Sequence, residues 1–285
     1  MSKKKRRDIP HYGLPILETH FHLDYLKEGD SAGVLAAGRA IGVERFITIS
    51  VEPANMPTAL GFSQQFDDVY CTLGVHPHEA ASFDDATEAY MREHASLQTN
   101  QGKVVAVGEI GLDYYYDHCD REVQKQVFRR QLELAIEFDL PVVIHTREAD
   151  EDTAAILREY APRMNHKGVI HSFTSGMELA KLGVELGFTL GINGIVTFNK
   201  ADNVREIVAA TPLESLLLET DSPYLTPIPY RGIENAPQYL PFIAERIAEV
   251  KEISVEQVLQ QTWQNSLRTF FAKQQQADPL TDTSA

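Results

Sequence analysis

Cysteine is scarce in this sequence: only Cys71 and Cys119 occur among 285 residues. Two cysteines cannot build a disulfide scaffold, and neither has the Cys-x-x-Cys spacing of a zinc clip, so we expect a reducing compartment. No apolar run approaches the ~18 residues that a membrane span needs. The charged start is not followed by the apolar stretch of a secretory signal. These absences predict a cytoplasmic protein that makes no membrane contact.

Basic residues are also in deficit, with 26 Lys and Arg against 41 Asp and Glu, which gives a net charge of −15. Such a surface repels polyanions and argues against tight, non-specific binding along a duplex. It does not exclude a nucleic-acid substrate, because divalent cations held in a cleft would dominate the local field. The charge pattern favours an enzyme acting locally on a phosphate over a protein that coats nucleic acid.

The two ends of the chain differ from the rest of it. Residues 3–7 form a basic run, for which a solvated disordered end and a nucleic-acid arm both remain open. No Gly- or Ser-rich linker and no internal repeat divides the remainder. We therefore predict a flexible tail over residues 1–12, a single domain over residues 13–272 and a flexible tail over residues 273–285. We expect a monomer without an obligate protein partner.

Eight apolar runs have the length and flanking turn signals of buried parallel strands. They span residues 14–19, 46–50, 69–73, 104–108, 141–145, 168–171, 188–191 and 216–219. Stretches with helical spacing alternate with them or follow the last one, over residues 32–42, 86–99, 121–138, 151–160, 178–186, 204–209, 237–251 and 255–271. This alternation predicts an α/β fold, a (β/α)₈ TIM barrel, with an open doubly wound sheet as the alternative.

The helix predicted over residues 121–138 carries a polar residue on its inward, apolar face. Four apolar side chains share that face at helical spacing, and only Gln131 interrupts them. Asp120 is the predicted N-cap of this helix. The last helix begins with Ser254 as its N-cap and Gln257 at the matching capping-box position.

Residues that can bind a metal follow several of the strand-like runs. They are His20, His22, Glu109, His145, His171, Glu219 and Asp221. Imidazole and carboxylate groups bind borderline and hard divalent ions. Because the carboxyl ends of parallel strands meet on one face of a sheet or barrel, these side chains should converge there. The sequence therefore predicts a metal-dependent active site.

His20 and His22 carry the strongest local signal. Residues i and i+2 of a strand point the same way, so both imidazoles can chelate one ion. Two buried structural histidines are the alternative. Glu109 brings a carboxylate to the end of an apolar strand, where it could bridge two ions or pair with Arg147. His145 and His171 are each weaker candidates, as single ligands to a second ion.

Asp221 could bind the first ion and act as the catalytic base towards water. Glu219 could serve instead, although its side chain should lie deeper in the barrel, and Asp221 could also be a simple turn residue. His76, after the third strand, could steer a phosphate or protonate a leaving group.

Three further residues near the expected mouth of the barrel are candidate substrate contacts. Arg147 and Arg231 could clamp a phosphate, with surface ion pairs as the alternative. Tyr114, Tyr115, Tyr116 and Tyr224 should lie near the same mouth and could stack against bases, although surface tyrosines more often only pack; Tyr114 is the predicted substrate contact among them.

Six motifs in chain order occupy residues 19–24, 74–78, 108–114, 141–147, 171–174 and 219–225. Together they resemble the TatD family of metal-dependent deoxyribonucleases over nearly all of residues 14–271. The resemblance implies a TIM barrel of the amidohydrolase type with two divalent ions. His20, His22 and Asp221 would hold the first ion, Glu109 would bridge, and His145 and His171 would hold the second. Glu18 stands where the family usually has Asp, and Ser175 replaces a usual Gly.

The expected function is therefore deoxyribonuclease activity resembling that of a 3′–5′ exonuclease. DNA, as single strands or free ends, would be hydrolysed by a water that two metal ions activate. The histidines favour Zn²⁺ or Mn²⁺ over Mg²⁺ at equilibrium, although added Mg²⁺ could still support activity. The alternative is a metal-dependent hydrolase of esters or amides, because the same ions polarise a carbonyl group as readily.

Overall fold

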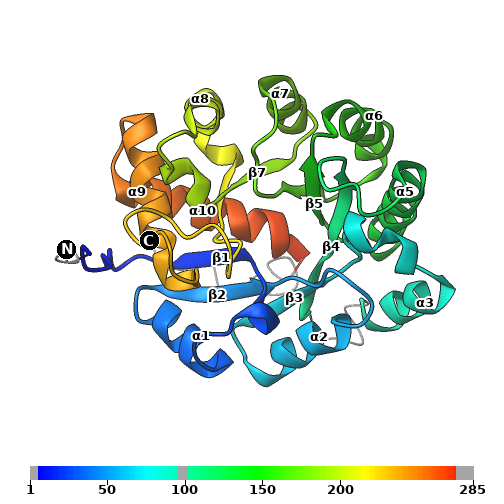
Figure 1. The fold of residues 1–285 in the computed structure, drawn as a ribbon, viewed down its shortest axis with the longest axis horizontal. Helices are drawn as coiled ribbons and strands as arrows, with labels where there is room; N and C mark the ends of the chain where they lie inside the picture. The colour runs from blue at the N-terminus through cyan, green and yellow to red at the C-terminus, as the bar shows by residue number, and fades with distance from the viewer. Residues whose placement is uncertain (1–5, 96–101, 274–285) are drawn as a thin grey trace.

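A computed structural model describes residues 6–95 and 102–273, and the elements in these ranges form a (β/α)₈ barrel (Figure 1). All strands pair in parallel, and their order in the sheet follows the chain. They are β1 (Ile16–Phe21), β2 (Val43–Thr48), β3 (Val69–Leu73), β4 (Val104–Asp113), β5 (Val142–Arg147), β6 (Gly168–Ile170), β7 (Thr189–Ile192) and β8 (Leu216–Leu218). This sequential order confirms the predicted barrel and is not that of a doubly wound sheet.

Backbone hydrogen bonds bring the first and last strands together. Asp221 donates from its amide to the carbonyl of His20 (2.9 Å), and His22 donates to the carbonyl of Ser222 (2.8 Å). These bonds lie just beyond the end of β8, so the barrel is nearly closed at the point where several predicted ligands lie.

Helices surround the strands (Figure 1). They are α1 (Ser31–Arg39), α2 (Met56–Gln65), α3 (Asp85–His94), α5 (Arg121–Phe138), α6 (Asp150–Tyr160), α7 (Met177–Glu185), α8 (Asp202–Ala210), α9 (Leu240–Lys251) and α10 (Val255–Phe270). None of the helices in the described part of the chain is long and apolar enough to cross a membrane.

Most of the predicted elements are present, with shifted ends. β1 lies two residues later than predicted, and β4 continues past residue 108 to Asp113. The prediction omitted α2, whose short length, Pro57 and Gly61 weaken its helical signal. Its buried residues Met56, Ala59, Leu60 and Ser63 nevertheless follow helical spacing. The predicted helix over residues 86–99 ends at His94, and residues 96–101 lie outside the described ranges.

The domain limits remain a prediction, because much of both tails lies outside the described residues. Residues 1–5, with most of the basic run, and residues 274–285 are in that part of the chain. Arg7 pairs with Glu245 of α9, and the Tyr12 hydroxyl donates to the same carboxylate (2.6 Å). The described residues 6–12 therefore lie against the barrel wall.

The barrel interior is apolar at the amino ends of the strands and polar at their carboxyl ends. Phe270 and Phe271, at the end of α10, pack there against residues from the first halves of the strands, such as Leu17, Val105 and Leu217. Water is thus excluded from one end of the barrel, and polar groups are confined to the other, as in other proteins of this architecture.

Gln131 of α5, which interrupts the apolar face, forms hydrogen bonds with the backbone of Val75, the residue before His76. Its side chain is fully buried. The amide oxygen accepts from the backbone N–H of Val75 (2.8 Å), and the amide nitrogen donates to the carbonyl of Val75 (3.0 Å). A polar residue therefore occupies a core position because it satisfies two buried backbone groups.

We expect Gln131→Leu to lower the free energy of unfolding by about 2–4 kcal/mol, because both backbone groups of Val75 would lose their partners. Urea denaturation measures this difference. The matched control is Gln126→Leu at an exposed position of α5, which should change the free energy by less than about 0.5 kcal/mol. Equal effects of the two substitutions would contradict the role assigned to Gln131.

Candidate active site

Glu109 lies at the centre of a cluster of four imidazoles inside the carboxyl end of the barrel. Its side chain is only 4% exposed, and its Oε1 lies 2.7 Å from His171 Nε2, 3.0 Å from His145 Nδ1 and 3.5 Å from His76 Nε2. Its Oε2 lies 3.4 Å from His20 Nε2. The two oxygens of one carboxylate thus face histidines from different strands and loops, as a bridging ligand would require.

Asp221 completes the cluster on the side of β1. Its Oδ1 lies 3.6 Å from His22 Nε2 and 3.8 Å from His20 Nε2. The residue has a positive φ of 57°, in the left-handed region that Asp tolerates better than most residues. The structure therefore brings together all six predicted metal ligands, and it places His76 beside them.

The cluster has unsatisfied groups that a metal ion would satisfy. Among the described residues, neither ring nitrogen of buried His20 has a hydrogen-bond partner. Buried polar atoms normally have partners, and imidazole nitrogens near carboxylates are typical ligands of divalent ions. Within residues 6–95 and 102–273, three sets have ligand atoms within 4.8 Å of one another: His20, His22 and Glu109; His76, Glu109 and His145; and His20, His171 and Glu219. The side chains in these sets are of the types that bind divalent metal ions, and they lie close enough together to bind one.

Electrostatics keep Glu109 ionised despite its burial. Burial alone would raise the pKa of its carboxyl, but the charge of the His171 imidazole and hydrogen bonds with His145 and His171 outweigh this effect and hold the pKa well below its usual value. Burial disfavours the charged imidazolium of His171, and the Glu109 carboxylate more than reverses this, so the pKa of His171 lies well above its usual value. The site therefore contains a buried, negatively charged carboxylate, Glu109, whose charge has to be offset by protonated imidazoles or bound metal ions.

Glu219 lies deeper than Asp221, as predicted. Its side chain is fully buried, and its Oε1 accepts from the backbone N–H of Ser172 (2.6 Å). The same oxygen lies 3.6 Å from His171 Nδ1. Glu219 is therefore placed behind His171, where a carboxylate can orient an imidazole towards a metal.

Glu18, the departure from the family pattern, lies under the ligands and not among them. Its Oε1 accepts from the backbone N–H groups of His20 (3.1 Å) and Thr220 (2.9 Å). Burial raises the pKa of its carboxyl to about 8. The longer side chain thus joins β1 to the segment after β8 directly beneath the cluster.

Sequence reasoning did not single out Asp113, which orients His145. The Nε2 of His145 donates to Asp113 Oδ2 (2.9 Å), which leaves Nδ1 facing Glu109. The Nε2 of His78 lies 3.0 Å from the same oxygen. Burial would raise the pKa of Asp113, but its bonds with these histidines lower it below its usual value. The only available signal was the Gly-Leu-Asp-Tyr motif, in which Asp113 lies five residues beyond the predicted end of the strand.

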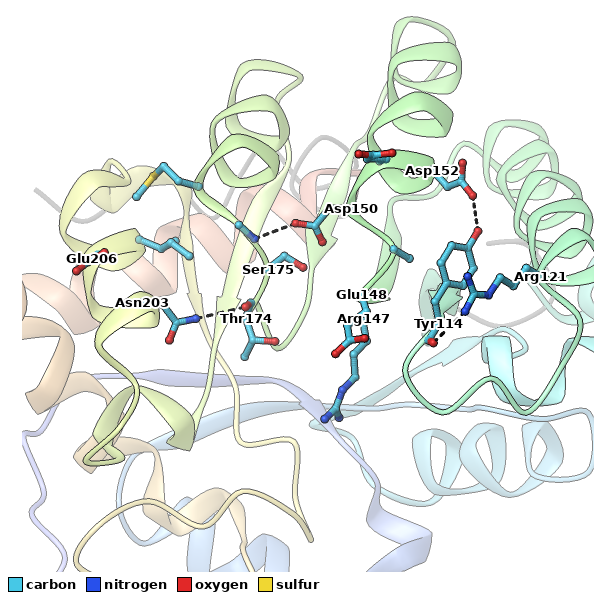
Figure 2. A pocket seen from close by; sticks show the side chains of 15 residues that line it. Tyr114, Arg121, Arg147, Glu148, Asp150, Asp152, Thr174, Ser175, Asn203 and Glu206 are labelled. Carbon is cyan, nitrogen blue, oxygen red and sulfur yellow. Dashed lines mark hydrogen bonds between the residues drawn. The ribbon is translucent and has the colours of Figure 1, made fainter.

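Arg147 does not pair with Glu109, which was one alternative. Its exposed guanidinium lies over the ring of Tyr115, 4.2 Å from the ring centroid. Over residues 6–95 and 102–273, Arg147 forms no salt bridge with any carboxylate, although it lies near the mouth of the barrel. In Figure 2 its side chain extends away from Asp150 and Asp152.

The other two predicted substrate contacts already have partners within the protein. The Tyr114 hydroxyl donates to Asp152 (2.5 Å), and Arg121 lies over its ring at 4.4 Å (Figure 2). The guanidinium of Arg231 lies 4.0 Å from the Phe198 ring centroid. Their predicted roles towards a substrate remain predictions.

A cavity of about 870 Å³ lies between the segments that follow β4, β5 and β6 and helix α8, which follows β7 (Figure 2). Tyr114 and Arg147 line it, together with five carboxylates and one further guanidinium: Glu148, Asp150, Glu151, Asp152, Glu206 and Arg121. The cavity is therefore acidic overall, and Arg147 is one of its two basic groups.

A barrel that gathers imidazoles and carboxylates around one buried carboxylate at its carboxyl end has the architecture of a metal-dependent TIM-barrel hydrolase. Comparisons with known proteins give the family. The TatD related DNase family matches residues 17–271, so the chain belongs to this family and is a metal-dependent hydrolase. The resemblance seen in the sequence is confirmed.

Three relatives cover most of the chain. YabD of Bacillus subtilis, described as an uncharacterized metal-dependent hydrolase, is 36% identical over 90% of this chain and 98% of its own. Deoxyribonuclease Tat-D of Schizosaccharomyces pombe is 32% identical over 89% of this chain and 91% of its own. The crystal structure of YjjV, a TatD homologue of Escherichia coli, superposes with a TM-score of 0.83 at 30% identity, covering 90% of this chain and 97% of YjjV.

We expect Zn²⁺ or Mn²⁺ to raise the melting temperature of the chelator-treated protein, because the buried imidazoles would coordinate the ions. At free metal one hundred times the dissociation constant, binding adds about 2.7 kcal/mol to stability, or a shift of roughly 5 °C. Differential scanning calorimetry measures the shift.

Glu109→Ala should abolish most of this shift, whereas Glu178→Ala, at an exposed position of α7, should retain it. A shift that Glu109→Ala leaves unchanged would contradict the assignment of Glu109 as a ligand.

Proposed function

We propose that this protein is a deoxyribonuclease that hydrolyses phosphodiester bonds of DNA, resembling a 3′–5′ exonuclease on single strands or free ends. The observation that carries the proposal is the convergence of four histidines and Asp221 around Glu109 at the barrel mouth. Membership of the TatD related DNase family supports it, as does the name of the Schizosaccharomyces pombe relative.

The ligand set supports two divalent ions, which could be Zn²⁺, Mn²⁺ or Mg²⁺. His20, His22 and Asp221 would hold one ion, His145 and His171 the other, and Glu109 would bridge them. Such ions lower the pKa of water and polarise a phosphoryl oxygen. Asp113 would keep His145 in the tautomer whose Nδ1 faces the site.

Asp221 is the residue we assign as the base. Burial opposes ionisation of its carboxyl, but the histidines around it hold its pKa below the usual value, so it is a carboxylate at neutral pH. Its side chain is 15% exposed, more than that of Glu109, and can therefore reach a water at the mouth. It would orient this water and accept its proton.

Arg147 and His76 would offset charge on the phosphoryl oxygens during hydrolysis. The guanidinium of Arg147 has no carboxylate partner among the described residues, so it is available to a phosphate. Burial holds the pKa of His76 well below its usual value, so we expect His76 to be neutral and to donate a hydrogen bond.

The acidic cavity favours a second candidate, hydrolysis of an uncharged ester or amide. The five carboxylates that line this cavity would repel a polyanion that entered it. The same metal cluster could polarise a carbonyl group. This candidate predicts turnover of esters or amides and no cleavage of oligonucleotides.

We further propose that the protein acts as a monomer in the cytoplasm. Cys71 and Cys119 are both free and buried, which is compatible with a reducing compartment.

Wild-type protein should shorten an end-labelled, single-stranded oligodeoxynucleotide stepwise in Mg²⁺ or Mn²⁺, and chelator should abolish the reaction. Glu109→Ala should lower the rate at least about a hundredfold, because even outer-shell changes at metal sites reduce activity 10–100-fold. Glu178→Ala is the matched control and should be as active as wild type. A metal-loaded wild-type protein that leaves the oligonucleotide intact but hydrolyses an ester would overturn the proposal in favour of the second candidate.

A further inference from the structure

Exposed large hydrophobic side chains of the described residues lie in two loops at the barrel mouth. In the described part of the chain they are Tyr115 (53% exposed) and Tyr116 (49%), after β4, and Tyr224 (54%) and Ile228 (37%), after β8. Single exposed apolar residues are common, but their restriction to the catalytic end indicates a binding surface. Tyr115 and Tyr116 keep about half of their surface exposed, although Tyr116 also stacks nearly parallel to the ring of His118 at 5.7 Å.

Asp113 ties these two tyrosines to the metal-binding cluster. Its Oδ1 accepts from the backbone N–H groups of Tyr115 (3.0 Å) and Tyr116 (2.9 Å). Its Oδ2 accepts from His145 Nε2 (2.9 Å), and the other nitrogen of that ring faces Glu109. One buried carboxylate therefore fixes both the loop that carries the rings and a candidate metal ligand.

Arg147 adds a cation to this aromatic surface. Its guanidinium lies 4.2 Å from the ring centroid of Tyr115 and 5.0 Å from that of Tyr116. The two rings meet edge to face at 4.9 Å, and Tyr116 also contacts His78. Arginine planes and tyrosine rings both stack on nucleobases, and a guanidinium can bind the phosphate at the same time.

We infer that Tyr115, Tyr116 and Arg147 form a stacking platform for an unpaired nucleobase next to the bond that is hydrolysed. The inference rests on the proposed nuclease function and adds the residues that would select the substrate. A base in a duplex already has both faces stacked, so the platform can engage only bases that are unstacked or single-stranded. Selection of the strand would thus come from aromatic contacts, in a protein whose net charge of −15 disfavours attraction of duplex DNA.

The test measures binding to the metal-loaded protein of two non-cleavable, phosphorothioate oligodeoxynucleotides of equal length, one of thymidines and one abasic. Wild type should bind the thymidine strand more tightly. Tyr115→Ala and Tyr116→Ala should each weaken that binding at least about fivefold and leave binding of the abasic strand unchanged. Tyr115→Phe and Tyr116→Phe are the matched controls, and they should bind like wild type because they keep the ring.

Alanine variants that bind both strands as wild type does would overturn the inference. So would an equal weakening of both strands, because that result indicates a change in structure and not a loss of stacking. Melting temperature and metal content should match those of wild type.

Cleavage of ordinary oligonucleotides by the same variants separates this inference from the proposed function. The alanine variants should raise KM at least about fivefold and keep kcat close to that of wild type. If wild type cleaves no oligonucleotide, the nuclease proposal fails, while the binding experiment still decides whether the platform recognises bases.

Discussion

The structure depends on one buried anion, the carboxylate of Glu109, and on the imidazoles that surround it. A carboxylate that is 4% exposed would be strongly destabilising without cationic partners. The barrel places imidazoles beside it from β1, from β5 and from the segments after β3 and β6, and the pKa values of His145 and His171 lie above the usual value, so these two carry a positive charge most readily. Around them lie groups whose task is to position ligands: Asp113 behind His145, Glu219 behind His171 and Glu18 beneath His20. The apolar packing of α10 confines this polar cluster to one end of the barrel.

The sequence predicts the ligands because it combines two regular features. Buried parallel strands appear as apolar runs, and side chains at their carboxyl ends must converge. His20, Glu109 and His145 could therefore be placed together without any structure, although β1 begins two residues later than expected. Gln131 shows the limit of this reasoning: a polar residue on an apolar face becomes intelligible only when the backbone of Val75 is seen beside it.

Sequence reasoning could not distinguish between residues whose roles depend on the direction of a side chain in a loop. Tyr114, Tyr115 and Tyr116 are adjacent and carry the same side chain; all three were candidates for stacking on bases, and Tyr114 was the predicted substrate contact. In the structure its hydroxyl is bound to Asp152, while its two neighbours are exposed beneath Arg147. Asp113 accepts hydrogen bonds from the backbone N–H groups of Tyr115 and Tyr116 and so fixes the position of this loop. Asp113 is the last residue of β4, which continues past Glu109 beyond the strand end expected from the sequence.

The central claim is that Glu109 bridges two divalent ions. Anomalous diffraction from crystals grown with Mn²⁺ or Zn²⁺, recorded at the absorption edge of the metal, tests it most directly. The account predicts two peaks on either side of the Glu109 carboxylate, one beside His20, His22 and Asp221 and the other beside His145 and His171. A single peak, or peaks that the oxygens of Glu109 do not contact, would contradict it.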